Sequence, residues 1–140
     1  MFKVCHMTSA HQPEDVRIFI KECCSVAEAG YDTYLVERGA TYIKNGVHII
    51  GTGDYKGNRL QRFTKQARLV YEAALRIDAD IYHIHDPELL PYALKLKQKG
   101  KIVVFDSHEY YSEQMKSKPY LPKCLRIIIA KLYKEFEDYV

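Results

Sequence analysis

Two groups of ionisable residues in the second half of the chain have side chains that could do chemistry. Each group directly follows a short apolar run. The first group is His83, His85 and Asp86, and the second is Asp106, His108 and Glu109. Imidazole and carboxylate groups hydrogen-bond hydroxyls and phosphates and can transfer protons near neutral pH. The sequence therefore indicates a binding or catalytic site built from these two groups.

The elements around the two groups predict how they are positioned. Residues 79–85 and 101–106 have the apolar character of strands, and residues 87–100 predict a helix that begins at Pro87 and ends at Gly100. Parallel strands joined by a crossover helix point the same way, so both groups should lie at one edge of a sheet. Ligands bind at this carboxyl edge in α/β proteins. Because the run 101–106 is almost wholly apolar, we expect that strand to be covered on both faces.

The rest of the chain continues the alternation of strands and helices. Strands are predicted over residues 2–8, 31–37 and 47–52, and helices over 16–29, 59–77 and 122–140. Glu14 or Asp15 can cap the first helix and Gly30 ends it, while residues 38–46 predict only a turn-rich connection. The fold class predicted is α/β: a single Rossmann-like, doubly wound parallel sheet with helices on both faces. The simplest strand order is 3-2-1-4-5, counted along the chain, with the crevice between the first and fourth strands.

Composition and missing motifs exclude several classes of protein. The 140 residues suit one domain, and the net charge of +3 is too small for a nucleic-acid-binding face. No GxGxxG, GxxxxGK[ST] or GxSxG motif occurs, which disfavours dinucleotide-binding domains, P-loop NTPases and α/β-hydrolases. The four cysteines form no CxxC motif and no paired His/Cys spacing typical of zinc, so we expect reduced thiols. The absence of a signal peptide and of a membrane-spanning apolar run predicts a cytoplasmic protein.

Several of these residues have a structural interpretation as well as a functional one. His6 and His83 lie inside predicted strands, where a core or hydrogen-bonded role is favoured. His85 ends its strand and should be presented to the crevice. Asp86 either caps the next helix or contacts a ligand.

Residues outside the first group also have both a structural and a functional interpretation. His108 either hydrogen-bonds a hydroxyl or phosphate or is a structural residue held by Asp106. His11 is either an ordinary polar loop residue or a ligand contact on the same edge. Arg17, on the following helix, either lies on a solvated face or braces the loop over the crevice.

Three motifs, taken together, resemble those of a known enzyme family. They are TSAHQPEDVRIFIKECCSVAEAGYDTYLVE at 8–37, HIHDPELLPYAL at 83–94 and FDSHEYY at 105–111. In this order and spacing they resemble the N-terminal half of family 4 glycosyltransferases of the GT-B fold. The nearest likeness is to bacterial enzymes of capsule, O-antigen or exopolysaccharide assembly, and the resemblance covers nearly the whole chain.

The resemblance implies a function for the domain. Enzymes of this kind have two Rossmann-like halves facing a cleft, retain the anomeric configuration and need no bound metal. Residues 1–140 would be the N-terminal, acceptor-side domain, whereas the C-terminal domain that binds the nucleotide sugar is absent. The complete enzyme would move a sugar from a nucleotide-sugar donor to a glycan or lipid-linked acceptor in cell-surface polysaccharide synthesis. The chain alone should be inactive.

The resemblance also implies roles for particular residues. The catalytic residues would be His108 and Glu109, the acceptor-binding residues His11, Gln12, His85 and Asp86, and the donor-phosphate loop Ser9 and Ala10. His108 would face the transferring sugar and steady its hydroxyls or developing charge. Many family members have a Gly-Gly pair in the loop, where this chain has Ala10-His11-Gln12. The His11 side chain would then replace backbone amides as the phosphate contact.

The basic residues after the third motif are expected to contact a membrane or an anionic acceptor. They are Lys116, Lys118, Lys123 and Arg126. Such a contact would make the protein peripheral at the inner face of the membrane. One alternative is a non-catalytic adaptor or membrane-docking domain that pairs with a separate donor-binding subunit. Another is one half of a sugar-nucleotide epimerase with the same two-domain fold.

Overall fold

The structure is a computed structural model that describes residues 1–54, 56–107, 131–132 and 134–140. The chain divides into two compact units, Met1–Asp106 and Ser107–Val140. The helices and strands described below all belong to the first unit. No helix in the described part of the chain has the length and apolarity that a membrane span requires.

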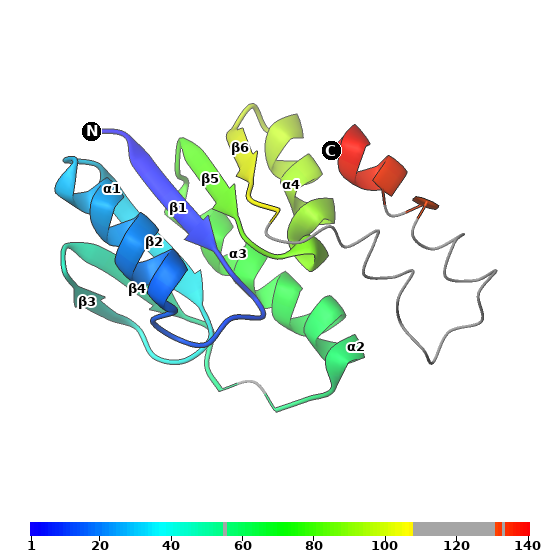
Figure 1. The fold of residues 1–140 in the computed structure, drawn as a ribbon, viewed down its shortest axis with the longest axis horizontal. Helices are drawn as coiled ribbons and strands as arrows, with labels where there is room; N and C mark the ends of the chain where they lie inside the picture. The colour runs from blue at the N-terminus through cyan, green and yellow to red at the C-terminus, as the bar shows by residue number, and fades with distance from the viewer. Residues whose placement is uncertain (55, 108–130, 133) are drawn as a thin grey trace. The chain divides into compact units, whose positions relative to one another are not determined.

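The first unit is built on a six-stranded, mostly parallel sheet (Figure 1). The strands are β1 (Lys3–Met7), β2 (Asp32–Glu37), β3 (Tyr42–Lys44), β4 (Val47–Gly51), β5 (Ile81–Ile84) and β6 (Ile102–Phe105). Their order in the sheet is β3-β4-β2-β1-β5-β6, and only β3 is antiparallel to its neighbour. Leaving β3 aside, this is the strand order predicted from the sequence. The prediction of an α/β fold with a mainly parallel sheet is confirmed.

Strand β3 was missed in the sequence, where residues 38–46 were expected to form only a connection. It pairs with β4 through a two-residue turn, Asn45-Gly46, in which both residues have positive φ (50° and 76°). These dihedrals fit the type I′ hairpin turn that an Asn-Gly pair favours. The strand is only three residues long and lies at the sheet edge, so the period-two pattern that identifies longer strands is too short to detect.

One face of the sheet is covered by a helical segment that begins with a π-helix. The segment consists of η1 (Val16–Cys23) and α1 (Cys24–Glu28), and Figure 1 shows it in front of the strands. Asp15 caps it as predicted, since its Oδ1 accepts hydrogen bonds from the backbone N–H groups of Arg17 (3.0 Å) and Ile18 (3.1 Å). The core beneath it is apolar, formed by Ile18, Phe19, Cys23, Cys24, Leu35, Val47 and Ile49. The three cysteines in the described residues are all free, as expected.

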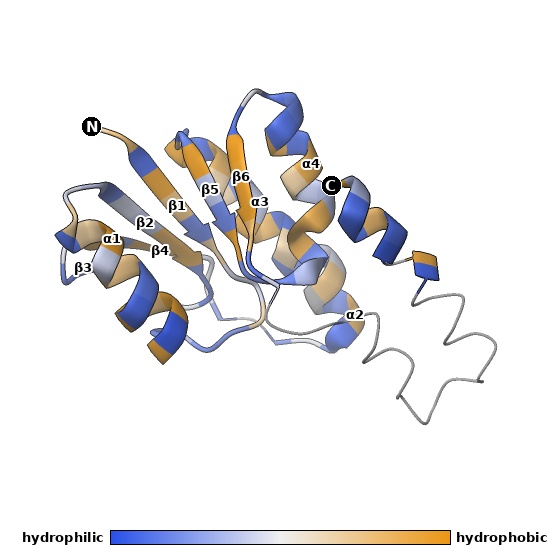
Figure 2. Cartoon of the chain, turned by 45° about the horizontal axis from the view of Figure 1, so that its top comes forward, coloured by the Kyte–Doolittle hydropathy of each residue, from blue (hydrophilic) through white to orange (hydrophobic). Residues whose placement is uncertain are grey.

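The helical run predicted over 59–77 also packs against the sheet, at β1 and β2. It consists of α2 (Arg59–Gln61), a π-helical stretch η2 (Arg62–Gln66) and α3 (Ala67–Ile77). Tyr82 of β5 is buried against it, and its hydroxyl donates to the carbonyl of Ala74 (3.3 Å) and accepts from the N–H of Ala79 (3.0 Å). Figure 2 shows apolar residues along the strands and mixed colours along the helices, as expected for elements with one buried side.

The crossover between β5 and β6 has the predicted form. A short 3₁₀ turn, η3 (Pro87–Leu89), leads into α4 (Leu90–Gln98), with Pro91 in its first turn. The expectation that the following strand is covered on both faces is wrong. In β6, which lies at the edge of the sheet, the side chains of Ile102 and Val104 are 57% and 45% exposed.

Candidate functional site

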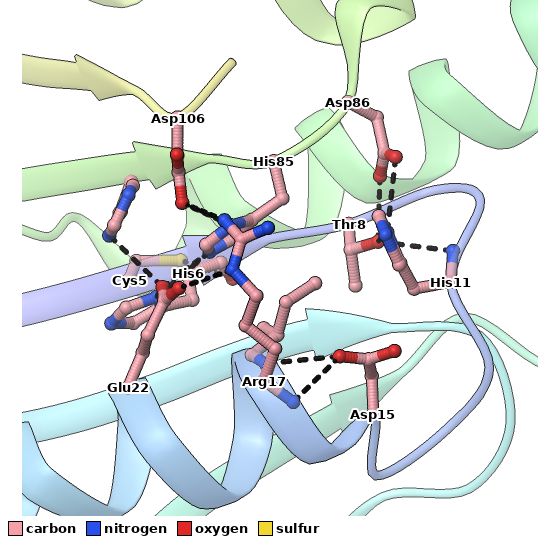
Figure 3. A network of polar contacts seen from close by, with 12 residues as sticks. Cys5, His6, Thr8, His11, Asp15, Arg17, Glu22, His85, Asp86 and Asp106 are labelled. Atoms are coloured by element: carbon pink, nitrogen blue, oxygen red, sulfur yellow. Dashed lines mark hydrogen bonds and ion pairs between the residues drawn. The ribbon is translucent and has the colours of Figure 1, made fainter. Parts of the chain in front are cut away.

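The carboxyl ends of β1 and β5 carry two neighbouring polar networks, which Figure 3 shows at close range. We call the first the Asp86 network, formed by Thr8, Ser9, Ala10, His11 and Asp86. We call the second the histidine cluster, formed by His6, Glu22, His83 and His85. A third feature, the loop pocket, lies at the carboxyl ends of β1, β2 and β4.

In the Asp86 network one buried carboxylate holds the loop after β1. Oδ2 of Asp86 accepts hydrogen bonds from Oγ1 of Thr8 (2.6 Å) and from the backbone N–H groups of Ser9 (2.8 Å) and Ala10 (3.3 Å). Nδ1 of His11 lies 3.2 Å from Oδ1 of the same carboxylate. The helix-cap interpretation of Asp86 is therefore wrong, because its side chain makes no capping bond to η3 and turns to the β1 loop instead.

The hydrogen bonds of this network decide the charges of its members. Burial would raise the pKa of Asp86, but hydrogen bonds from His11 and Thr8 outweigh it and hold that pKa below its ordinary value. The same bond to Asp86 raises the pKa of His11. The side chain of His11 is 31% exposed. The network thus presents a histidine that tends to be protonated, oriented by an ionised aspartate.

The predicted donor-phosphate loop is already engaged with a carboxylate. The backbone N–H groups of Ser9 and Ala10 donate to Asp86, and Oγ of Ser9 donates to Oε1 of Glu88 at 3.0 Å. Successive backbone N–H groups that hold a carboxylate are of the kind that hold a phosphate. Contact of Ser9 and Ala10 with a donor diphosphate stays a prediction.

In the histidine cluster three imidazoles surround one carboxylate oxygen. His6 and His83 are direct partners on the parallel strands β1 and β5, and His85 follows on the same face. Glu22 comes from η1, and its Oε2 lies 3.9 Å from Nδ1 of His6, 3.8 Å from Nδ1 of His83 and 3.6 Å from Nε2 of His85. Nδ1 of His6 and Nε2 of His85 are 3.0 Å apart, a hydrogen-bond distance. These four residues could hold a metal ion, since their ligand atoms all lie within 4.8 Å of one another.

Burial keeps the imidazoles of this cluster neutral. It lowers the pKa of His6 to about 3 and that of His85 to about 2, and neighbouring histidines add to both shifts. Burial is also the main cause that lowers the pKa of His83. Burial and then the charge of Asp106 raise the pKa of Glu22. The cluster therefore offers imidazole lone pairs rather than positive charge.

The structure tests two expectations for these histidines. His6 is buried and hydrogen-bonded within its strand, as predicted. The expectation that His85 is presented to the crevice is wrong, because its side chain is fully buried, with its ring stacked on that of His6 and tilted against that of His83. Asp86 is also buried, so two of the four predicted acceptor-binding residues do not reach solvent, whereas His11 and Gln12 do.

Arg17 links the histidine cluster to the end of β6. Its Nη2 forms a close ion pair with Oδ2 of Asp106, and its Nε lies 3.5 Å from Oε1 of Glu22. Oδ2 of Asp106 in turn lies 4.0 Å from Nδ1 of His85. These contacts join η1 to the carboxyl edge (Figure 3). Arg17 is thus ion-paired rather than solvated, but in the described residues its side-chain partners are Glu22 and Asp106 and not the loop after β1.

The loop pocket lies where the chain leaves three parallel strands. It has a volume of about 340 Å³ and is lined by Gln12, Pro13, Arg38, Gly39, Asp54 and Lys56. Backbone hydrogen bonds between Gly39 and Gly53 (2.9 and 3.0 Å) join two of its loops. Gly51 permits their close approach, since a Cβ there would lie 2.1 Å from the carbonyl oxygen of Gly39. Gln12, predicted to bind the acceptor, is thus placed in a pocket with two cationic side chains.

The other predicted site residues lie outside the described residues. They are the catalytic pair His108 and Glu109 and the basic residues Lys116, Lys118, Lys123 and Arg126. Sequence reasoning missed Glu22 in the histidine cluster and Arg38 and Lys56 in the loop pocket. The alternation of His83 and His85 could have revealed two rings on one strand face. Nothing in the sequence distinguishes Glu22 from other helical glutamates.

No protein-family model matches the chain, and no curated protein sequence matches it.

Proposed function

We propose that the chain is the acceptor-binding half of a retaining glycosyltransferase, with a doubly wound, Rossmann-like fold. The complete enzyme transfers a sugar from a nucleotide sugar to a glycan or lipid-linked acceptor. The observation that carries this proposal is the loop pocket, which lies at the carboxyl ends of β1, β2 and β4 and contains Gln12. The resemblance of the three sequence motifs to family 4 enzymes supports the same function.

The chemistry of the pocket suits an acceptor that carries phosphate. Its volume of about 340 Å³ lies at the lower end of the range for small-molecule sites. Arg38 and Lys56 supply two positive charges against the one carboxylate of Asp54, and the amide of Gln12 can hydrogen-bond a sugar hydroxyl or a phosphate oxygen. A diphosphate-linked lipid offers the anionic group that these side chains recognise, and its sugar offers the hydroxyls.

His11 adjoins this pocket in the sequence and supplies a further polar contact. Asp86 orients its ring and favours its protonated form. An imidazolium in this position hydrogen-bonds an acceptor phosphate or hydroxyl and so helps to orient the nucleophile. Orientation of this kind is a large part of what an enzyme contributes to a group transfer.

The Asp86 network and the histidine cluster bear on why the acceptor-binding half alone should not transfer a sugar. Departure of a nucleoside diphosphate requires fixed donors or cations at the leaving group. The backbone N–H groups of Ser9 and Ala10 already donate to Asp86, and the imidazoles of the histidine cluster are neutral. Because the cationic side chains of Arg38, Lys56 and His11 are assigned to the acceptor, we assign stabilisation of the leaving group to the donor-binding half.

Calorimetric titration of the 140-residue chain tests the proposal. We expect binding of a short polyprenyl-diphosphate sugar and at most weak binding of a nucleotide sugar. Arg38→Ala should weaken acceptor binding by about tenfold to a hundredfold, the value of one charged hydrogen bond to phosphate. Arg68→Ala is the matched control, because Arg68 is an exposed arginine of α3 that pairs with Glu72.

Two results would count against this function. One is tight binding of the nucleotide sugar, which would make the chain a donor-binding domain. The other is an equal loss of acceptor affinity in Arg38→Ala and Arg68→Ala, which would mean that the acceptor responds to overall charge and not to the loop pocket.

A further inference from the structure

We propose that the histidine cluster is a zinc site in which His6, Glu22, His83 and His85 are the four protein ligands. Figure 3 shows Glu22, His6 and His85 converging from the helix and the strands. The site is separate from the loop pocket, and the proposal does not depend on the function proposed above.

The ligand types and their spacing fit Zn²⁺. Three imidazole nitrogens and one carboxylate oxygen form a donor set that zinc accepts in tetrahedral geometry. Metal–ligand bonds of about 2.0–2.1 Å place tetrahedral ligand atoms about 3.3 Å apart. Oε2 of Glu22 lies 3.6–3.9 Å from the three nitrogens, and the nitrogens of His6 and His85 are 3.0 Å apart. The carboxylate pairs must close by about 0.3–0.6 Å and the pair of His6 and His85 must open by about 0.3 Å, within a set of ligand atoms that all lie within 4.8 Å of one another.

The unfilled hydrogen bonds of the cluster favour a cation. Oε2 of Glu22 is buried and has no hydrogen-bond partner among the described residues, although three ring nitrogens surround it. A buried carboxylate oxygen without a donor is unfavourable, and buried polar atoms rarely lack a partner. A cation at the centre of the cluster satisfies this oxygen and the inward-facing lone pairs of the rings at once.

The protons of the two buried rings must move when zinc binds. In the metal-free cluster, the 3.0 Å contact between Nδ1 of His6 and Nε2 of His85 requires one nitrogen to carry a proton. Zinc takes both lone pairs only when His6 carries its proton on Nε2 and His85 on Nδ1. Nδ1 of His85 is then 4.0 Å from Oδ2 of Asp106, and closing this gap to hydrogen-bond distance would give a carboxylate–histidine–metal arrangement with Asp106 as a positioning residue.

The ring of His6 makes zinc binding less favourable. Nε2 of His6 is buried without a partner in the described part of the chain, so placing the proton there leaves an unsatisfied donor. This weakens zinc binding by about tenfold to a hundredfold relative to a fully hydrogen-bonded site. The ion can enter from the solvent past Glu22 and His83, because their side chains are each 22% exposed.

Zinc in this position would join three elements of the fold. Glu22 lies near the end of η1, His6 lies in β1, and His83 and His85 come from β5 and its end. Four protein ligands leave no open coordination position, which is typical of a structural zinc site. Binding therefore stabilises the folded domain, and the melting temperature should rise by roughly 5–10 °C at a hundredfold excess of zinc over Kd.

The test uses the 140-residue chain freed of metal and titrated with Zn²⁺ and, separately, with Co²⁺. We expect one ion per chain, the intense visible absorption of tetrahedral Co²⁺, and the rise in melting temperature. His83→Ala should weaken binding at least a hundredfold, and its partial exposure makes it the histidine ligand whose loss disturbs folding least. Glu22→Gln removes the carboxylate while keeping its size. Circular dichroism checks that both variants fold.

His48→Ala is the matched control, because His48 is a partly exposed histidine of β4 that lies 3.7 Å from a carboxylate of Asp32. It should bind zinc like the unaltered chain. The proposal is overturned if the unaltered chain binds neither ion, if Co²⁺ gives the weak spectrum of a six-coordinate ion, or if folded His83→Ala and Glu22→Gln bind zinc as tightly as His48→Ala. Acceptor binding at the loop pocket is measured independently of all these outcomes.

Discussion

Asp86 and Glu22 are two carboxylates at the same edge of the sheet, and they differ in the groups that surround them. Asp86 receives a hydroxyl, two backbone N–H groups and an imidazole. Oε2 of Glu22 faces three imidazole nitrogens and receives no hydrogen bond in the described residues. The pKa of Asp86 is accordingly lowered and that of Glu22 is raised.

This difference separates a structural carboxylate from one prepared for a ligand. Donors that converge on Asp86 fix the β1 loop and orient His11, so the network positions neighbouring residues while remaining buried. Ring nitrogens that converge beside Glu22 leave a place for a cation. The two adjacent clusters have similar composition but different roles. They differ in whether hydrogen-bond donors converge on the carboxylate, as they do at Asp86, or are missing from it, as at Oε2 of Glu22.

The largest effect should come from removing Asp86. Asp86→Ala leaves Thr8, the loop N–H groups and His11 without their acceptor, so the free energy of unfolding should fall by about 4 kcal/mol. Glu22→Gln should lower the free energy of unfolding of the metal-free protein by less than about 1 kcal/mol, because Oε2 of Glu22 accepts no hydrogen bond in the described residues and its Oε1 lies 3.5 Å from Arg17. Urea denaturation of both variants measures the two values. Equal losses would show that the two carboxylates do not differ in the way described.

A third carboxylate, Glu37 at the end of β2, extends the comparison to pH. It is buried, its Oε2 accepts only a 3.3 Å bond from the N–H of Glu14 in the described residues, and burial raises its pKa from 4.5 to about 7. Between these pH values the folded state keeps a proton that the unfolded state loses. The free energy of unfolding should therefore fall as pH rises from about 4.5 to 7, by at most about 3 kcal/mol.

Glu37→Gln provides the control for this pH dependence. The amide does not titrate, so the fall between pH 4.5 and 7 should disappear from its stability profile. An unchanged profile would show that Glu37 is ionised in the folded protein and resembles Asp86 rather than Glu22.

A smaller effect is expected from His11, the exposed partner of Asp86. Its raised pKa means that its ion pair contributes stability below the ordinary histidine pKa and loses it as pH rises through the folded value. His11→Ala should lower the free energy of unfolding by about 1 kcal/mol at pH 6 and by less at pH 9. A loss that grows toward pH 9 would contradict the assigned direction. His48→Ala again serves as the control histidine.

Local sequence signals predicted much of the fold because they act over a few residues. The cap at Asp15, the stop at Gly30 and the start at Pro87 each appear where expected. The alternation of elements then gave the order of the parallel strands. The hairpin at Asn45-Gly46 was recognised as a turn but not as the junction of two strands, because β3 is too short to show a period.

The candidate site was less predictable because its contacts join distant parts of the chain. Asp86 looked like a helix cap from its neighbour Pro87, but its partners lie 76–78 residues earlier in the chain. Glu22 faces histidines only because η1 crosses the face of the sheet at that point. The pairing of His6 with His83 depends on the register of β1 and β5, which a single sequence does not reveal.

The most direct test of the proposed function is to map ligand binding by NMR on the isotopically labelled chain. Addition of a polyprenyl-diphosphate sugar should shift the amide resonances of the loop pocket, at Gln12, Arg38, Gly39, Asp54 and Lys56, together with His11. A nucleotide sugar should leave the same resonances unchanged. Shifts at these residues with the nucleotide sugar, and none with the lipid-linked sugar, would contradict the assignment of this domain to the acceptor.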